Sequence, residues 1–220
     1  SSTDVLPYAQ PFFYRSIVGA LQYLTITRPD IAFAVNQACQ HMQAPTNAHF
    51  ALVNRLLRYL QGTVSHGLTF TKGSYDLHAF TDSNWAGDCT DRRSTSGFCI
   101  NLGSNLISWS SKKQPTVSRS STEAEYRSMA HTTAEICWLQ QLLKELYVPA
   151  SAVPVLWCDN VSAMALASNP VFHSKSKHIE VDCHFIREKV VSKQISLAYI
   201  ASDDQIADIF TKPLSSPRFL

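Results

Sequence analysis

Four acidic residues in the second half of the chain stand at positions that ordinary structural roles do not fully explain. They are Asp82, Glu125, Asp159 and Asp208. Carboxylates are hard oxygen ligands, and a site built from them without imidazole or thiolate favours Mg²⁺. Each of the four is expected on a different strand or helix, so they form such a site only if the fold brings those elements together.

Asp82 is predicted to lie at or just inside the end of a strand. Residues 77–82 alternate with the period of two that is typical of a strand, and Ser83, Asn84 and Gly87 then supply turn residues. A sheet would fix the position of the Asp82 carboxylate while its oxygens face a cleft. The alternative is a side chain that only caps the turn.

Glu125 is predicted on a long helix. Ser120 and Glu123 have the spacing of a capping box, and the helix that they open should reach about Leu146. Glu125 points about 200° away from Glu123 around the helix, toward the apolar side that should face the sheet. A carboxylate there is costly to bury unless a positive charge, such as a metal ion, compensates it. The alternative is a partly exposed helix carboxylate.

Asp159 directly follows the apolar run 155–158, which predicts a central parallel strand buried on both faces. Residues 160–167 look helical, so Asp159 would stand at the carboxyl end of a strand, where open α/β sheets bind ligands. The alternative is that Asp159 caps this helix.

Asp208 is predicted on a helix that follows a strand over residues 194–200. Ser202 and Gln205 have the spacing of a capping box for that helix. Asp208 lies beyond the first helical turn, so the helix dipole does not account for it.

The remaining patterns define the fold class. Residues 96–102 and 105–110 predict a hairpin, which forms an antiparallel meander with the Asp82 strand. The N-terminal third predicts helices over 14–24, 29–42 and 47–60, the last one capped by Asn47, and 72–74 is the best domain boundary. The prediction is an α/β fold in which helices flank a five-stranded mixed sheet, preceded by a small helical segment.

Composition limits the class of protein. The 220 residues are 45% hydrophobic and carry a net charge of +2, so there is no global polycation. The six cysteines show no zinc spacing and are interpreted as reduced thiols of an intracellular protein. There is neither a membrane-spanning run nor a signal peptide, and the missing initial Met suggests a fragment or a processed piece.

Seven motifs in order resemble the C-terminal part of the Pol polyprotein of copia-type LTR retrotransposons, from Tyr14 to about Leu214. These motifs are 14–24, 27–31, 57–63, 108–114, 120–126, 177–179 and 207–214. The resemblance implies that residues 1–73 are a thumb or connection-like segment of a reverse transcriptase, that 74–214 are a ribonuclease H domain, and that 215–220 are a flexible tail.

The resemblance also implies a function and a cofactor. Asp82, Glu125, Asp159 and Asp208 correspond to the four acidic metal ligands of a type 1 ribonuclease H, which uses two Mg²⁺ ions, with Mn²⁺ able to substitute, to cut the RNA strand of RNA–DNA hybrids. The expected partners are the hybrid and the upstream polymerase domain, without a membrane. The expected location is intracellular, in cytoplasmic virus-like particles or in the nucleus. Nothing in the sequence indicates the oligomeric state.

Contacts with the hybrid are predicted from local charge, because residues 92–127 carry six basic residues against two acidic ones. The predicted contacts are Asn84, Arg92, Arg93, Ser94, Lys112, Lys113, Ser118, Arg119, Lys175, Lys177 and His178. The mobile His that cellular enzymes place before the last acidic residue has no counterpart in residues 201–204.

Two other functions fit parts of the pattern. The chain could be a catalytically idle module that binds nucleic acid or assembles the polyprotein, although four intact carboxylates favour a nuclease. A DDE integrase shares the general fold, but the seven motifs and the helix-borne Glu125 argue against it. Polymerase activity is excluded for this piece, which lacks a Tyr-x-Asp-Asp motif.

Overall fold

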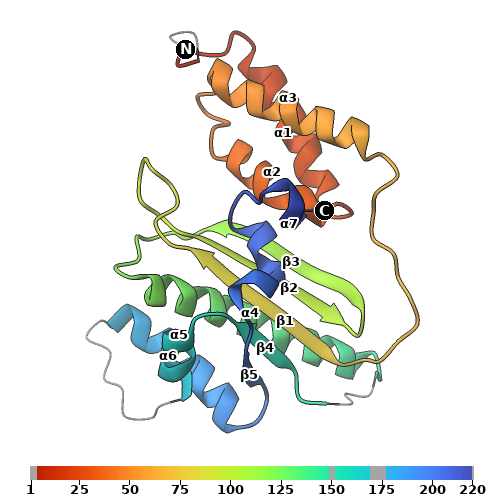
Figure 1. Cartoon of the computed structure of the whole chain (residues 1–220), viewed down its shortest axis with the longest axis vertical. Helices are drawn as coiled ribbons and strands as arrows, with labels where there is room; N and C mark the ends of the chain where they lie inside the picture. The colour runs from red at the N-terminus through yellow and green to blue at the C-terminus, as the bar shows by residue number, and fades with distance from the viewer. Residues whose placement is uncertain (1–3, 149–151, 169–176, 220) are drawn as a thin grey trace. The chain divides into compact units, whose positions relative to one another are not determined.

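The computed structural model describes residues 4–148, 152–168 and 177–219 (Figure 1). The chain divides into two compact units, residues 1–69 and 70–220. This division falls a few residues before the predicted boundary at 72–74.

The first unit is helical, as its apolar spacing predicts. It contains α1 (Pro11–Leu24), the 3₁₀ turn η1 (Pro29–Ile31), α2 (Ala32–Cys39) and α3 (Asn47–Gly62). Tyr14, Val18, Val35 and Val53 are almost completely buried between these helices. The Tyr14 hydroxyl donates to the carbonyl of Ala38 at 2.9 Å, so the largest core side chain also satisfies its polar atom.

Two details of this unit differ from the sequence prediction. The second helix begins as a separate 3₁₀ turn, and Arg28 before it pairs with Asp30 and donates to the carbonyl of Thr63. The cap of α3 is Thr46 rather than Asn47. The Thr46 hydroxyl accepts from the backbone of His49, and His49 Nδ1 accepts from the backbone of Thr46.

The second unit is built on a five-stranded mixed sheet, which confirms the predicted fold class. Its strands are β1 (Leu77–Asn84), β2 (Thr95–Leu102), β3 (Asn105–Lys113), β4 (Val155–Cys158) and β5 (Ser196–Tyr199). The order is β3-β2-β1-β4-β5, with β1, β2 and β3 antiparallel and β4 and β5 parallel to β1. The carboxyl ends of β1 and β4 therefore lie side by side, and Asp82 and Asp159 stand at these ends.

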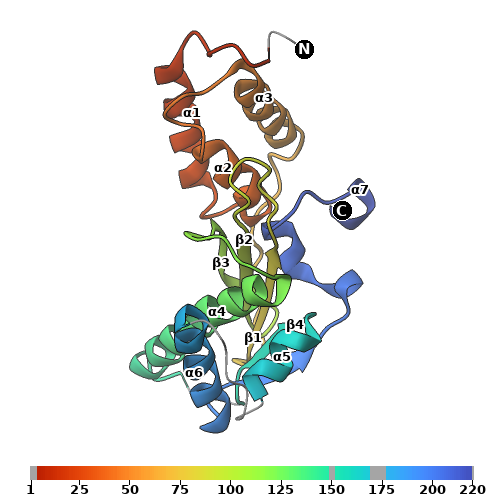
Figure 2. The same ribbon diagram turned by 90° about the vertical axis from the view of Figure 1, so that its left-hand side faces the viewer.

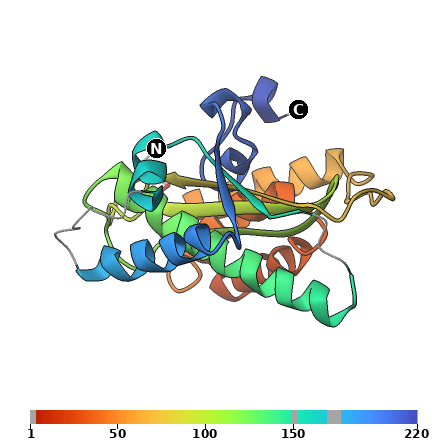
Figure 3. The same ribbon diagram turned by 90° about the horizontal axis from the view of Figure 1, so that it is seen from below.

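One face of the sheet is covered by helices. These are α4 (Ser121–Glu145) and α6 (Lys177–Val191), with α5 (Val161–Ser168) packed beside them. Figures 2 and 3 show α4 and α6 next to each other on this face. Tyr126, Met129 and Ile136 of α4 are fully buried here, in one core with Ile100 and Leu156. This core fixes α4 against the strand that carries Asp82.

The opposite face of the sheet is less covered. In β4, Leu156 and Cys158 are buried, whereas Val155 and Trp157 are only half buried. The prediction that this strand is buried on both faces was therefore wrong, because α4 and α6 cover only one side.

The C-terminal segment lies on that second face (Figure 3), but it is not the predicted helix. It forms the 3₁₀ turns η2 (Ser202–Asp204) and η3 (Ile206–Phe210), followed by α7 (Ser216–Phe219). The side chain of Gln205 accepts from the backbone of Ala207 and donates to the carbonyl of Thr81 at 3.0 Å. The predicted capping pair thus serves tertiary contacts, which bring η3 onto β1 and β2.

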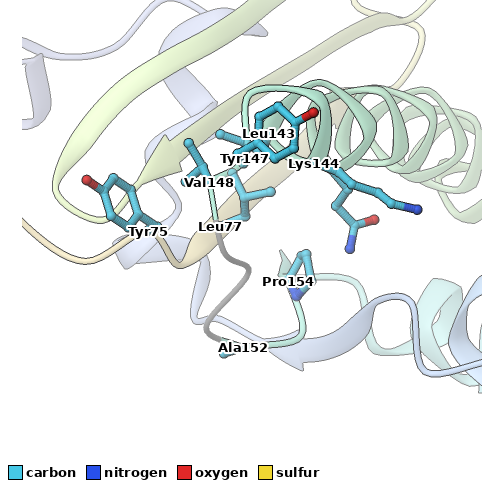
Figure 4. Close-up of a pocket in the computed structure, with 9 residues that line it drawn as sticks. Tyr75, Leu77, Leu143, Lys144, Tyr147, Val148, Ala152 and Pro154 are labelled. Carbon is cyan, nitrogen blue, oxygen red and sulfur yellow. The ribbon is translucent and has the colours of Figure 1, made fainter.

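A hollow of about 420 Å³ lies at the C-terminal end of α4 (Figure 4). Its lining includes Leu77 at the start of β1, Pro154 just before β4, Leu143, and the aromatic side chains of Tyr75 and Tyr147. None of the four predicted metal ligands lines it. It lies at the amino ends of the strands, away from the carboxyl ends that carry Asp82 and Asp159.

We predict that Gly97→Ala destabilises the second unit. Gly97 pairs with Asp82 across β1 and β2. An added Cβ would lie 2.6 Å from Thr211 Cγ2 and 2.7 Å from Phe210 Cβ, too close for either to remain in place. The free energy of unfolding should fall by about 1–3 kcal/mol, as expected for overpacking. Urea denaturation measures the change.

Gly19→Ala is the matched control. Gly19 lies inside α1, and its added Cβ would meet nothing within 4 Å. This change should be neutral or stabilise the helix by up to about 1 kcal/mol. Equal effects of the two substitutions would contradict the close approach at Gly97.

Candidate metal centre

The structure brings the four predicted carboxylates to one place at the carboxyl ends of β1 and β4. Asp82, Glu125 and Asp208 are only 3%, 6% and 1% exposed, and Asp159 is half buried. Asp82 interacts electrostatically with both Asp208 and Asp159, and Glu125 with both Asp82 and Asp159. Each carboxylate comes from a different element, in the order β1, α4, the end of β4 and η3.

The backbone of Asp82 is held by a chain of buried hydroxyls. Ser128 on α4 donates to the carbonyl of Asp82 at 2.9 Å, and Thr81 donates to Ser128 at 2.9 Å. Thr132, one helical turn beyond Ser128, donates to Thr81 at 3.1 Å. The Asp82 carboxylate itself accepts from the hydroxyl of Thr211 through Oδ2. The hydroxyl bonds of Ser128 and Thr132 hold β1 against α4 next to the carboxylates.

Glu125 has one satisfied oxygen and one unsatisfied oxygen. The backbone of Ser83 donates to its Oε1 at 3.1 Å, whereas Oε2 is buried without a hydrogen-bond partner among the described residues. Glu123 points elsewhere, as predicted. Ser120 caps its backbone, but the Glu123 carboxylate accepts from Arg119 rather than from Ser120 and pairs with Arg127.

Gln114 ties together the elements around the site. Its amide nitrogen donates to Ser96 Oγ at 2.9 Å and to the carbonyl of Ala124 at 3.0 Å, and its amide oxygen accepts from Ser118 at 2.8 Å. This buried side chain joins β2 to the first turn of α4. The position of Glu125 therefore depends on Gln114 as well as on its own helix.

Asp159 follows β4 and does not cap α5. Asn160 does so instead, because its side-chain oxygen accepts from the backbone of Ala163 at 2.9 Å. Asp159 Oδ2 accepts from the hydroxyl of Ser202 at 2.8 Å. Its carboxylate is therefore not engaged as a helix cap and faces the C-terminal segment.

Asp208 is neutralised by two cations. Lys212 Nζ lies 2.7 Å from Asp208 Oδ1 and 3.8 Å from Asp82 Oδ2, and Arg218 lies 3.1 Å from Asp208 Oδ2. Both cations are more than a third exposed, whereas the carboxylate is buried. They can therefore move into solvent more easily than the carboxylate can.

The crowding of negative charge changes the acidity of the site. Burial raises the pKa of Asp82 to about 6, although Thr211 and Lys212 counteract it and the charges of Asp208 and Asp159 add to it. Burial and the charge of Asp82 raise the pKa of Glu125 well above its usual value. A cation bound next to these buried carboxyls would stabilise their charged form.

The residues fit a divalent metal centre. The unpaired buried oxygen of Glu125 and the mutually repelling carboxylates are what a bound cation would satisfy. Hard oxygen donors dominate the donor set, which suits Mg²⁺. Cys158 also contributes a sulfur atom, because Glu125, Cys158 and Asp159 offer ligand atoms within 4.8 Å of one another.

The predicted nucleic-acid contacts fall into three groups. Arg92, Arg93, Lys112 and Arg119 are exposed, and Asn84 is half buried at the end of β1. Ser94, Ser118 and Lys113 are engaged inside the protein, as described next. Lys175 lies outside the described residues, and the structure places only the backbone of Lys177 and His178, at the start of α6.

The prediction of direct substrate contact fits poorly for Ser94, Ser118 and Lys113. Ser94 is fully buried and its hydroxyl accepts from the backbone of Ala86. Ser118 is 2% exposed and donates to Gln114. Lys113 forms ion pairs with Asp88 at 2.5 Å and with Asp91 at 2.9 Å. Internal bonds therefore occupy these three polar groups.

Several residues of the site were missed by the sequence predictions. Lys212 lies four residues after Asp208, a spacing at which opposite charges pair, so this contact could have been predicted. Gln114, Ser128 and Thr211 gave no local signal, because their partners are distant in the sequence. Cys158 was read only as part of an apolar strand.

Comparison with known proteins identifies relatives over nearly the whole chain. The retrovirus-related Pol polyprotein from transposon RE2 of Arabidopsis thaliana is 52% identical over 210 residues, which are 95% of this chain and 14% of that protein. The Pol polyprotein from transposon TNT 1-94 of Nicotiana tabacum is 37% identical over 94% of this chain and 16% of its own length. No protein-family model matches the sequence.

The chain belongs to the Pol polyproteins of copia-type retrotransposons. This Pol segment spans only about a seventh of the length of those relatives. Among solved structures it resembles the foamy viral protease–reverse transcriptase, which was solved in complex with an RNA/DNA hybrid. The TM-score is 0.53 at 12% identity, over 92% of this chain and 26% of that protein. The second unit has the five-stranded mixed sheet with flanking helices that the sequence predicted.

None of the described helices of the Pol segment is both long enough and apolar enough to cross a membrane.

We predict that the Mg²⁺ affinity of the Pol segment rises with pH. The Asp82 carboxyl, with its pKa of about 6, must lose its proton before it binds a cation, and the raised pKa of Glu125 extends the effect upward. Calorimetric titration with Mg²⁺ between about pH 5 and 8 should show the rise. An affinity that is independent of pH in this range would contradict it.

The same pKa shift predicts the opposite trend for stability without metal. The folded protein binds more protons than the unfolded chain between the usual Asp pKa of 3.8 and about 6. The free energy of unfolding in chelator should therefore fall as the pH rises through this window. Asp82→Asn should reduce this slope in denaturation experiments.

We predict that Lys212→Met destabilises the metal-free protein. The change removes a cation from buried Asp208 and leaves Arg218 as its partner. The free energy of unfolding in chelator should fall by about 1–3 kcal/mol. Added Mg²⁺ should raise the melting temperature more in the variant than in the wild type, because the ion supplies the missing charge.

Lys72→Met is the control for this experiment, because Lys72 is exposed in the linker before β1. It should leave both quantities unchanged. Identical Mg²⁺ responses in Lys212→Met and the wild type would show that Lys212 does not share the carboxylates with the metal.

Proposed function

We propose that the second unit is a ribonuclease H that hydrolyses the RNA strand of RNA–DNA hybrids during retrotransposon reverse transcription. The observation that carries this proposal is the cluster of Asp82, Glu125, Asp159 and Asp208, in which the buried Oε2 of Glu125 has no hydrogen-bond partner among the described residues. Membership of the Pol family and the ribonuclease H-like fold support it.

The four carboxylates would hold two Mg²⁺ ions, with Mn²⁺ able to substitute. When bound, such ions activate a water for attack on the phosphodiester and stabilise the leaving 3′ oxygen. Asp82 is the best placed of the four to share both ions, because its charge acts on Asp208 and Asp159 and on Glu125. Ser202 orients Asp159, and Ser83 orients Glu125.

The exposed cations beside the site would bind the phosphates of the hybrid. Lys112 on β3 pairs with Ser96 on β2, which in turn pairs with Ser83 on β1. Lys112 is therefore one residue along the sheet from the pair formed by Asp82 and Gly97. Arg92 and Arg93 precede β2, and Arg119 precedes α4. All four are exposed, so their charges reach solvent on β3 and on the loops that join β1 to β2 and β3 to α4.

The wider setting follows from the Pol family. We propose that residues 1–73 are the thumb or connection-like end of a reverse transcriptase and that the upstream polymerase domain is the partner of residues 74–214. The tail that we propose for residues 215–220 is attached to this domain, because Arg218 lies 3.1 Å from Asp208 Oδ2. The enzyme would act inside the cell, in the particles where the element is copied or in the nucleus.

We predict metal-dependent cleavage of a labelled RNA–DNA hybrid that vanishes in chelator. Asp82→Asn and Asp159→Asn should each reduce the rate roughly 10³-fold or more, because a metal ligand contributes several kcal/mol to the transition state. Asp204→Asn is the control, since Asp204 is exposed on η2, close in sequence to the site. Gel electrophoresis of the RNA strand measures all four proteins.

The second candidate function gives a different result. An idle nucleic-acid-binding module would bind the hybrid in a salt-sensitive manner and never cut it in Mg²⁺ or Mn²⁺. Clusters of exposed cations are compatible with both functions. The nuclease is supported if the wild type cleaves the hybrid and both Asp82→Asn and Asp159→Asn fail to do so.

We predict that Lys112→Gln weakens hybrid binding in chelator without a preference for sequence. Loss of one phosphate contact should reduce the slope of log K against log salt by about 0.7–0.9. Lys193→Gln is the control, because Lys193 is exposed beyond the end of α6. Fluorescence anisotropy at several salt concentrations measures the slope, and equal slopes for both variants would remove Lys112 from the binding surface.

A further inference from the structure

We propose that Cys158, Glu125 and Asp159 form a binding site for a soft divalent cation such as Zn²⁺ or Cd²⁺, and that this cation excludes Mg²⁺ from the same carboxylates. The site differs from the Mg²⁺ centre by its sulfur ligand. Its ligands come from the end of β4 and from the first turns of α4.

The three ligand atoms are already close together. A sulfur of Cys158 and one carboxylate oxygen each of Glu125 and Asp159 lie within 4.8 Å of one another. In a tetrahedral zinc site, with bonds of about 2.3 Å to sulfur and 2.1 Å to oxygen, neighbouring ligand atoms are about 3.6 Å apart. Rotations that move the side chains by about 1 Å would therefore close the site, with a fourth position left for water.

Glu125 provides an independent sign of a missing ligand. Its Oε2 is buried without a hydrogen-bond partner among the described residues, while Oε1 is held by the backbone of Ser83. A buried carboxylate oxygen without a partner is costly. A cation bound by the Glu125 carboxylate, which offers one of its oxygens within 4.8 Å of the Cys158 sulfur, could satisfy it.

Cys158 selects the kind of cation. Its thiol is fully buried, and its Sγ accepts from the backbone of Asn160 at 3.4 Å, which fixes the sulfur at the end of β4. When a soft cation binds, the sulfur–metal bond replaces the S–H bond, and the proton leaves to solvent.

Thiolate ligands bind Zn²⁺ and Cd²⁺ far better than Mg²⁺. Ordinary Mg²⁺ concentrations would leave the sulfur protonated, whereas a soft cation would recruit it together with two of the four carboxylates. This second consequence, inhibition of hybrid cleavage, rests on the proposed nuclease. The binding of the soft cation does not.

Cadmium titration of the 220-residue chain tests the binding directly. The background should be Cys89→Ser, because Cys89 is an exposed thiol that could bind Cd²⁺ by itself. We expect a thiolate-to-cadmium charge-transfer absorption that saturates at one equivalent and that weakens as the pH falls. Addition of Cys158→Ser should abolish this absorption.

Cys99→Ser is the matched control. Cys99 is also buried, but it lies on β2, which β1 separates from β4, and it does not belong to the ligand group. Its variant should retain the full absorption. Absence of the band in the background protein, or its persistence after Cys158→Ser, would overturn the proposal.

Cleavage assays then separate the site from the nuclease. Zn²⁺ in the presence of excess Mg²⁺ should inhibit the wild type at least 10-fold more strongly than Cys158→Ser. Equal inhibition of both proteins would refute the competition. If the wild type does not cleave at all, the proposed function fails, while the cadmium titration still decides whether the soft-metal site exists.

Discussion

Repulsion between carboxylates that the fold holds out of water is the constraint on which the second unit depends. Three of the four acidic groups are almost completely buried, and for Asp82 and Glu125 burial disfavours the charged form and raises the pKa. Such an arrangement persists only because the surrounding structure is stable enough to impose it. The α4 core and the pairing of β1 with β2 and β4 provide that stability.

The protein limits this repulsion by two different means. Buried hydroxyls and the amide of Gln114 hold the backbone at the carboxylates, and Thr211 donates directly to Asp82. Lys212 and Arg218 bring positive charge to Asp208 from the partly exposed C-terminal segment. Hydrogen bonds therefore fix the geometry, whereas the cations that balance the charge remain displaceable. Gly97 allows this segment to approach the sheet closely enough for both.

This division explains how one site can be stable without metal and still suit a metal. Lys212 lies beside Asp82 and Asp208, so a cation that bound these carboxylates would compete with it, and metal binding would then be linked to the position of the C-terminal segment. Cys158 lies beside Glu125 and Asp159 and offers a soft donor atom. Under our proposal, the hard and soft donors together would determine which cations the site accepts.

The sequence by itself determined the elements that carry local signals. Period-two alternation gave β1, the hairpin residues gave β2 and β3, and the cap at Ser120 gave the start of α4. The spacing of acidic residues, together with the family resemblance, identified the four carboxylates.

The tertiary structure alone decided their surroundings. Gln205 bonds to Thr81 and Ser202 to Asp159, so the predicted capping box became two 3₁₀ turns. Ser94 and Ser118 are buried and Lys113 pairs with Asp88, because the fold brings their partners close to them. Local propensity acts over a few residues, whereas these bonds join segments up to 124 residues apart, and no local pattern encodes them.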